Sequence, residues 1–297
     1  MATKTKEASK RVPARNYPDL HDHLKALDDA GLLVTVDREI NKDTEMHPLV
    51  RWQFRGGIEE KDRKAFLFTN VVDTKSKKFD MPVAVGVLAA NRKIYAMGMG
   101  CAVEEVQKRW NEAIASPISP NPISGDEAPC QEIVIEGAEL DQPGNALDAL
   151  PVPISTPGWD VGPVATLTQF VTKDPDNGLQ NMGNYRAQVK GKKRMGMNPS
   201  LELRPGIYTH WEKMKARGEK LPAAVVLGAP SCVTFTAAQK LPEQVEEGKK
   251  YQAQERMNKR GGGMMNINRM TAPLGYALGG PAGMTELERK SAQPVTM

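Results

Sequence analysis

The feature that most constrains the fold is a proline-rich stretch, Ser116-Pro-Ile-Ser-Pro-Asn-Pro-Ile-Ser124. Its prolines cannot continue a helix, because each lacks a backbone N–H and has a fixed φ angle. Apolar residues before it alternate between helical spacing and short strand-like runs, whereas the pattern after it is rich in strands. The sequence therefore predicts a disordered tail over residues 1–16, an α/β domain over 17–115, a linker over 116–129 and a β-rich domain over 130–297.

Helices and strands alternate in the pattern of the first domain. Asp19 can cap a helix that presents Leu20, Leu24 and Leu27 on one face and ends at Gly31. Strands are expected at 32–36, 65–72 and 82–90, and further helices at 48–54 and 103–114.

The second part of the chain reads as strands with one clear helix. A strand is expected at 130–135, and strands at 166–173 and 181–189 form a hairpin through the turn Asp174-Pro-Asp-Asn-Gly178. A helix at 207–217 and a strand at 223–227 complete the pattern.

Composition limits the class of protein. The chain is 40% hydrophobic and 26% charged, as globular proteins are, with a net charge of +4. Basic residues are scattered among acids and only 5% of residues are aromatic, so we expect an anionic small molecule rather than nucleic acid as a partner. No apolar run approaches the length of a membrane span. The spacing of Cys101, Cys130 and Cys232 predicts buried thiols in a reducing compartment, by default the cytoplasm.

The histidines indicate structure rather than chemistry. His21 and His23 are two residues apart on a predicted helix, where side chains do not face each other, so we expect two solvent-side residues and no metal pair. His47 and His210 are also expected to be structural. The usual hydrolase, kinase and dinucleotide-binding motifs are absent from the sequence.

Two polar segments have more chemical content. Lys190-Gly-Lys-Lys-Arg194 is either a phosphate site or, as is more usual for a run of charge, a solvated hairpin end. In Asn181-Met-Gly-Asn-Tyr-Arg186, the amide can ligate a divalent cation and the guanidinium can bind a carboxylate or phosphate. These two side chains lie on opposite faces of one strand unless the strand ends or bulges between them, and Gly183 permits a bulge.

Several segments, in this order, resemble the UbiD family. The turn at 174–178 followed by Asn181-Met-Gly-Asn-Tyr-Arg-Ala-Gln-Val189 is similar to the family's N-x-G-x-Y-R-x-Q pattern. Thr156-Pro-Gly-Trp-Asp-Val-Gly-Pro163, Val226-Leu-Gly-Ala229 and Leu241-Pro-Glu-Gln-Val-Glu-Glu247 also match, and the resemblance covers about residues 17–247. It implies an α/β domain followed by a split-barrel flavin-binding domain.

The resemblance implies non-oxidative, often reversible decarboxylation of an aromatic or α,β-unsaturated carboxylic acid with prenylated FMN. Arg186 would be catalytic, facing the substrate carboxylate. Asn181 and Glu247 would ligate manganese or magnesium, which with potassium bridges the flavin phosphate. The implied cofactor-binding residues are Asn184, Tyr185, Arg186, Asn198, Pro199, Ser200 and Arg204. A flavin prenyltransferase would supply the cofactor, and a homo- or hetero-oligomer is expected.

The sequence departs from the family pattern in three places. Position 184 is usually apolar in the family, and the segment 197–204 lacks the family's usual His- or Gly-rich sequence. Gly275-Tyr-Ala-Leu-Gly-Gly280 resembles the helix that normally carries the metal glutamate, so Gly275 is an alternative equivalent of that position. The strand that carries the family's catalytic glutamates would lie beyond Met297. The expectation is a truncated enzyme, a subunit completed by another chain, a non-catalytic flavin-binding or assembly subunit, or a decayed gene product without a stable fold.

Overall fold

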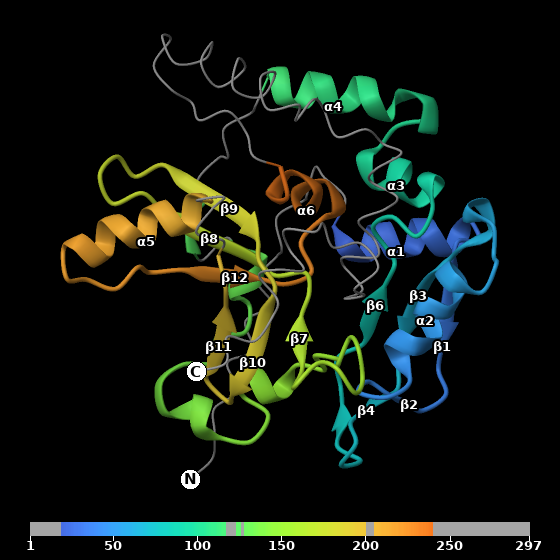
Figure 1. Cartoon of the computed structure of the whole chain (residues 1–297), viewed down its shortest axis with the longest axis horizontal. Helices are drawn as coiled ribbons and strands as arrows, with labels where there is room; N and C mark the ends of the chain where they lie inside the picture. Colours follow the sequence, from blue (N-terminus) through green and yellow to red (C-terminus); the bar gives the residue numbers. More distant parts are fainter. Residues whose placement is uncertain (1–18, 117–122, 126–127, 200–204, 240–297) are drawn as a thin grey trace, which may run out of the picture.

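The structure, a computed structural model, describes residues 19–116, 123–125, 128–199 and 205–239. The predicted tail over 1–16 lies outside these residues, as do part of the predicted linker and everything after residue 239. Within the described part, a helix-covered sheet formed by the first hundred residues lies beside two further three-stranded sheets formed later in the chain (Figure 1).

The first sheet has the strand order β1-β3-β6. Its strands are β1 (Leu33–Val36), parallel to β3 (Ala65–Phe68), and β6 (Val83–Val85), antiparallel to β3. A second sheet of very short strands, with order β2-β4-β5, consists of β2 (Ile40–Asn41), β4 (Val71–Val72) and β5 (Lys78–Phe79). The helices of this region are α1 (Leu20–Asp29), α2 (Met46–Arg55), α3 (Arg92–Met99) and α4 (Val106–Ala115), with 3-10 turns η1 (Glu60–Asp62) and η2 (Val103–Glu105).

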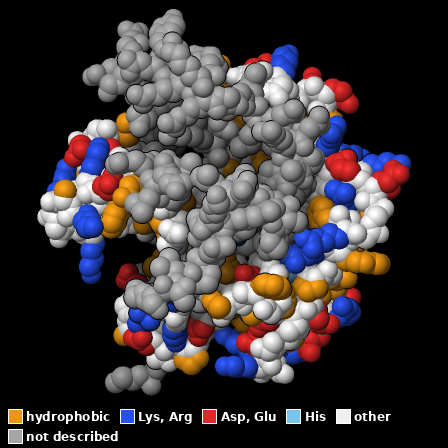
Figure 2. Space-filling view, viewed as in Figure 1, with side chains coloured by type: hydrophobic (Ala, Val, Ile, Leu, Met, Phe, Trp, Pro, Cys, Tyr) orange, Lys and Arg blue, Asp and Glu red, His pale blue; other side chains and the backbone are white. Residues whose placement is uncertain are grey.

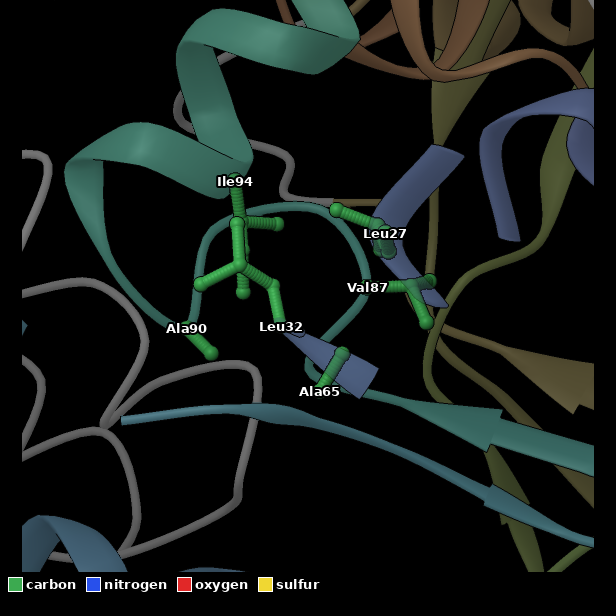
Figure 3. Packing of buried hydrophobic residues seen from close by; sticks show 6 residues of the cluster. All are labelled: Leu27, Leu32, Ala65, Val87, Ala90 and Ile94. Carbon is green, nitrogen blue, oxygen red and sulfur yellow. The ribbon is translucent and has the colours of Figure 1, made fainter. Parts of the chain in front are cut away.

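Hydrophobic residues from both faces of the first sheet form its core. One cluster, drawn in Figure 3, joins α1 and α3 to the sheet and consists of Leu27, Leu32, Ala65, Val87, Ala90 and Ile94. A second cluster packs α2 against the other strands and consists of Ile40, Met46, Val50, Phe68 and Val71. The cap predicted at Asp19 is present, because its carboxylate accepts from the backbone N–H of Asp22 at 2.9 Å. The Asp22 carboxylate accepts from the backbone N–H of Asp19 in return, which makes the pair a capping box.

Two antiparallel sheets form the later part. In the sheet of order β12-β8-β9, the strands are β8 (Gln169–Lys173), β9 (Gln180–Asn184) and β12 (Ala224–Val226). In the sheet of order β11-β10-β7, they are β7 (Val164–Ala165), β10 (Ala187–Gly191) and β11 (Arg194–Met197). Helix α5 (Gly206–Ala216) packs on β8 and β9, and α6 (Ser231–Ala237) packs on β9 and α3. The 3-10 turns are η4 (Pro129–Gln131), η5 (Gly137–Asp141) and η6 (Leu147–Ala149).

Helix α6 connects the two parts of the molecule. The rings of Tyr95 in α3 and Phe235 in α6 have centroids 4.5 Å apart. A Cβ at Gly98 would lie 3.0 Å from both Ser231 and Phe235, so glycine at this position allows the two helices to approach closely. This contact fixes α6, and with it the residues that α6 contacts on β9, relative to the first sheet.

Several sequence-based expectations are wrong in detail. Residues 130–135 form a 3-10 turn and an exposed segment instead of a strand, and Ile133 is 79% exposed, because no described strand lies beside it to take up its backbone hydrogen bonds. His23 is buried rather than on the solvent side, since it shares a helix face with Leu27, and its Nε2 lies 2.7 Å from the carbonyl oxygen of Val87. The thiols of Cys130 and Cys232 are exposed, not buried.

We predict that Leu27→Ala lowers the free energy of unfolding by about 2–5 kcal/mol, because it opens a cavity in a core with no solvent access to that side chain. Chemical denaturation measures this. Leu179→Ala, the same change at a side chain that is 46% exposed, is the matched control and should cost about 0.5 kcal/mol. Equal costs at the two positions would contradict the packing described here.

Candidate functional site

The segment that carries Asn181 and Arg186 is broken into two strands that belong to different sheets. β9 ends at Asn184, Tyr185 and Arg186 lie between strands, and β10 begins at Ala187. The predicted single strand over 181–189 is therefore wrong. Of the two alternatives left open, a bulge at Gly183 or an end of the strand, the structure shows the end, because the β8–β9 pairing runs without a shift from Asn184 to Gln180. Because β9 ends at Asn184, the side chain of Arg186 does not have to point to the opposite face of the strand from that of Asn181.

Tyr185 folds back over the strand that precedes it. A Cβ at Gly183 would come within 2.5 Å of the Tyr185 ring, so only glycine at 183 leaves room for this placement. The ring also meets Phe170 edge-on at 6.0 Å between centroids. Burial raises the pKa of Tyr185, and this is partly opposed by its contacts with the Asn181 side chain and the backbone of Ile207. Tyr185 thus connects β9 to the start of α5.

Asn181 is enclosed between Tyr185 and the first residue of α5. A Cβ at Gly206 would lie 2.2 Å from its Oδ1, and its Nδ2 is buried with no hydrogen-bond partner among the described residues. An amide oxygen is a suitable ligand for Mn²⁺ or Mg²⁺, and a buried amide without a partner is the kind of group that a bound ion would satisfy. The described residues contain no cluster of three or more His, Cys, Asp or Glu that could hold a metal, and Glu247 lies outside them. They therefore supply one candidate ligand.

Asn184 bridges β8, β9 and α6 through its side chain. Its Oδ1 accepts from Gln169 Nε2 at 2.9 Å, and its Nδ2 donates to the carbonyl oxygen of Thr234 at 3.0 Å. Because the side-chain oxygen and nitrogen of Asn184 are both hydrogen-bonded, its backbone is the part that remains to contact a ligand. The polar side chain at a position that is apolar in the resembling family is explained by this bridge.

A cavity of about 720 Å³ lies where the two sheets meet, which is within the usual size range of ligand pockets. Its lining consists of Ser155, Asp160, Val164, Thr166, Asn184, Tyr185, Arg186, Gln188, Lys190, Gly196, Met197, Asn198 and Pro205. The structure thus brings together four of the predicted site residues, Asn184, Tyr185, Arg186 and Asn198. Asn181 contacts Tyr185 from outside the lining, Pro199 follows Asn198 without lining the cavity, and Ser200, Arg204 and Glu247 lie outside the described residues.

The structure divides the predicted basic cluster at 190–194. Lys190 lines the cavity, whereas Lys192 and Lys193 lie in the turn between β10 and β11. Lys193 pairs with Asp141 at 2.5 Å, and Lys192 donates to the carbonyl oxygen of Asp141 at 2.6 Å. Lys192 and Lys193 are thus structural. The sequence did not predict that Gln188 and Lys190 line the same cavity as Arg186.

The far wall of the cavity is fixed to α2. Arg51 Nη2 donates to Thr156 Oγ1 at 3.3 Å, and the carboxylate of Asp160 accepts from the backbone N–H of Thr156 at 2.7 Å. Burial lowers the pKa of His47 to about 4, with a further contribution from Arg51 and an opposing one from Asp160, so the imidazole is neutral at physiological pH. His47 is therefore a buried, neutral residue, and its structural role stays a prediction.

Two family profiles match this chain. The 3-octaprenyl-4-hydroxybenzoate carboxy-lyase N-terminal domain matches residues 24–114, and the 3-octaprenyl-4-hydroxybenzoate carboxy-lyase Rift-related domain, UbiD, matches residues 121–253. The chain belongs to the UbiD family.

Solved UbiD-class structures share the fold. HmfF from Pelotomaculum thermopropionicum, an evolved dimeric form in complex with prFMN, is 25% identical with a TM-score of 0.62, over 75% of this chain and 47% of that one. Vanillic acid decarboxylase from Sedimentibacter hydroxybenzoicus, in closed form, is 26% identical with a TM-score of 0.63, over 76% of this chain and 46% of that one. This chain thus spans about half the length of these UbiD-class proteins. None of its described helices is long and apolar enough to cross a membrane.

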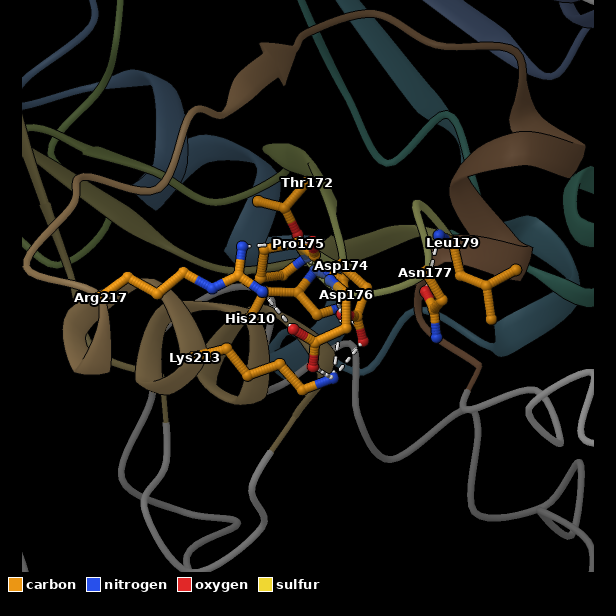
Figure 4. Close-up of polar contacts among 9 residues, drawn as sticks. All are labelled: Thr172, Asp174, Pro175, Asp176, Asn177, Leu179, His210, Lys213 and Arg217. Carbon is orange, nitrogen blue, oxygen red and sulfur yellow. Dashed lines mark hydrogen bonds and ion pairs between the residues drawn. The ribbon is translucent and has the colours of Figure 1, made fainter.

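In this UbiD-family chain, an ionic network holds the β8–β9 turn against α5 (Figure 4). Lys213 donates to both carboxylate oxygens of Asp174, at 2.9 and 2.7 Å, and lies 2.9 Å from Asp176, which also pairs with Arg217. His210 Nδ1 lies 2.9 Å from Thr172 Oγ1. The network sits at one end of β9 and therefore helps to fix Asn181 against the start of α5.

The network predicts how stability depends on pH. Burial raises the pKa of Asp174, but the hydrogen bonds from Lys213 and the backbone of Asp176 outweigh it, so the net pKa is lowered; Lys213 likewise lowers the pKa of Asp176. Carboxylates with a lowered pKa stabilise the fold above their unfolded pKa, about 4, and this stabilisation is lost as the pH falls through the folded-state values.

We therefore expect the free energy of unfolding to fall below about pH 4, and Asp174→Asn to be less stable at pH 7 with a shallower decline in acid. Chemical denaturation at a series of pH values measures both effects. Asp80→Asn, a change at an exposed position outside the network, should keep the acid profile of the wild type. An Asp174→Asn profile that parallels the wild type would rule out the role given to this network.

Proposed function

We propose that this chain carries the N-terminal and flavin-binding parts of a UbiD-type carboxy-lyase. The reaction is a non-oxidative, reversible decarboxylation of an aromatic or α,β-unsaturated carboxylic acid with prenylated FMN. The observation that carries the proposal is the cavity in which Arg186 lies beside Asn184, Tyr185 and Asn198, in a chain of the UbiD family. The relatives support it, since one holds prFMN and another is a vanillic acid decarboxylase.

We infer two domains, over 17–115 and 130–297, joined by the linker at 116–129. The two profile matches support this division, because the first ends at 114 and the second begins at 121, near and within the proline-rich stretch. The sheets β12-β8-β9 and β11-β10-β7 would then be parts of the split barrel that binds the flavin, and the cavity between them would be its cofactor site.

The proposed cofactor site uses side chains and backbone in different ways. Asn181 would ligate Mn²⁺ or Mg²⁺ together with Glu247, and with potassium this ion would hold the flavin phosphate. Asn184 and Tyr185 would contact the flavin through their backbone, with further contacts from Asn198, Pro199, Ser200 and Arg204. Prenylated FMN, when bound, supplies the sink for the electrons released as carbon dioxide leaves.

Arg186 would hold and orient the carboxylate of the substrate. Its guanidinium is exposed and has no hydrogen bond or ion pair to another described residue, so it is available for bidentate recognition of an acid. Neighbouring apolar side chains of the cavity, Val164 and Met197, would exclude water from the reacting group.

A non-catalytic flavin-binding or assembly subunit is the alternative. Asp160 is the only carboxylate among the described lining residues, and it already accepts a hydrogen bond from the Thr156 backbone. A decarboxylase needs an acid to return a proton to the product, so this observation favours the alternative if no carboxylate is added by the rest of the protein or by a partner. In either case we propose a flavin prenyltransferase as cofactor supplier, an oligomeric assembly and a cytoplasmic location.

The test is co-expression of the full chain with a flavin prenyltransferase, followed by measurement of bound flavin by absorbance and of carbon dioxide released from aromatic and cinnamic acids. We expect flavin to be retained, and Asn181→Ala to lower metal and flavin content. We expect Arg186→Ala to reduce carbon dioxide release by at least about 100-fold, since it removes the group that orients the acid.

Asn111→Ala and Arg109→Ala on the surface of α4 remove the same groups away from the cavity and should behave as the wild type. Bound flavin without carbon dioxide release from any acid would support the non-catalytic alternative. Absence of bound flavin, or full activity of Arg186→Ala, would contradict the proposed function.

A further inference from the structure

The polar face of β10 forms one side of the cavity. Arg186, which immediately precedes β10, and Gln188 and Lys190 within it all line the cavity. The β10–β11 pairing shifts register between Val189 and Gly191, that is, at Lys190. Ala187 points the other way and is fully buried in a cluster with Phe170 and Ile207. The strand therefore presents a cation at each end of its polar face, with an amide between them.

Neither of these cations is neutralised by the described part of the protein. Arg186 and Lys190 have no ion pair with another described residue, in contrast to Lys193, which pairs with Asp141. The visible surface mixes acidic and basic side chains (Figure 2). The described lining of the cavity instead holds two cations and one acid. Asp160 is the single acid of the described lining, and it is engaged by the Thr156 backbone.

A glycine of the neighbouring strand β11 leaves space for the side chain of Lys190. A Cβ at Gly196 would lie 2.6 Å from Lys190 Cε, so the stem of the lysine lies across β11 at the glycine that also lines the cavity. Gly196 pairs with Gln188 in the β10–β11 ladder. The missing side chain at 196 therefore leaves the room that the lysine stem occupies.

Arg186 and Lys190 are four residues apart, so their Cα atoms are separated by roughly 13 Å in an extended chain. They are close enough for their long side chains to hold the two ends of an aromatic ring system. The flavin phosphate is proposed to bind at Asn181, which contacts Tyr185, the residue before Arg186. Lys190 lies four residues beyond Arg186 and is therefore further along the chain from the proposed phosphate position.

We propose that this site takes an aromatic acid with a second anionic group, with Arg186 holding the reacting carboxylate and Lys190 the second anion. This inference rests on the proposed function and narrows its substrate class to dianions. Lys190 is then a specificity-determining residue. A singly charged acid would leave the lysine unpaired, and a dianion gains one further charge-assisted hydrogen bond.

The experiment is isothermal titration of the full chain, with and without FMN, using benzene-1,4-dicarboxylate and 4-methylbenzoate at constant ionic strength. FMN without the prenyl group keeps binding separate from turnover. We expect the wild type to bind the dicarboxylate about tenfold more tightly than the monoacid, and Lys190→Ala to remove this preference. Lys190→Arg should retain it, because the charge remains.

Two further variants sharpen the test. Gly196→Ala should weaken the preference, because the new methyl group displaces the lysine stem, and its backbone is not in a conformation that requires glycine. Lys193→Ala, which removes a lysine already paired with Asp141, is the matched control and should keep the preference.

Each remaining outcome has a distinct meaning. If 4-methylbenzoate binds through Arg186 and the dicarboxylate binds no better, the dianion proposal is wrong and the proposed function stands. If Lys190→Ala weakens binding of FMN but not of riboflavin, the lysine holds the cofactor phosphate, which also overturns the dianion proposal. If neither acid binds, or if Arg186→Ala changes nothing, the proposed function fails as well.

Discussion

The contact on which the site depends is the packing of Tyr185 over Gly183. Because glycine has no side chain at this point of β9, the ring can fold back and reach the Asn181 side chain and the start of α5. The chain leaves β9 at Asn184 and enters β10 of the other sheet at Ala187, and Arg186 lies between the two strands with its side chain lining the cavity. A larger residue at 183 would force the ring out, and the positions of Asn181 and Arg186 would no longer be coupled.

The surroundings hold this arrangement from both sides. The ionic network of Asp174, Asp176 and Lys213 fixes the turn before β9 to α5, and the bridge from Asn184 to Thr234 fixes its other end to α6. Helix α6 in turn packs on α3 of the first sheet through Phe235 and Tyr95. The described lining of the cavity comes from the later part of the chain alone. The first part supports it from outside, through Arg51 on Thr156 and through Tyr95 on Phe235.

Local patterns were sufficient to predict elements that bury one face. The helix at α1, with its cap at Asp19, and the hairpin of β8 and β9, with its turn at Asp174, were both predicted because spacing and turn residues are read from neighbouring positions. A break between Asn181 and Arg186 was one of two alternatives, and its place after Asn184 was not predicted, since it depends on the fit of Tyr185 against Gly183. The strand expected at 130–135 failed for a related reason: an apolar run becomes a strand only when another strand lies beside it.

The candidate site was predicted from the family resemblance more than from local chemistry. The resemblance implied Asn184, Tyr185, Arg186 and Asn198, which the structure places around one cavity. Asp160 lay in a matching segment and Lys190 in a basic cluster that was left open as a phosphate site, but neither was assigned to this site. The position of Lys190 depends on the β10–β11 pairing and on the space left by Gly196, which local patterns do not show. The roles of Ser200, Arg204 and Glu247 stay predictions.

The most direct test of this account is the flavin content of Gly183→Ala, purified after co-expression with a flavin prenyltransferase. The account predicts a folded protein, with the circular dichroism of the wild type, that retains little or no flavin, because the new methyl group displaces Tyr185 from Asn181 and α5. A Gly183→Ala protein that retains as much flavin per chain as the wild type would contradict it.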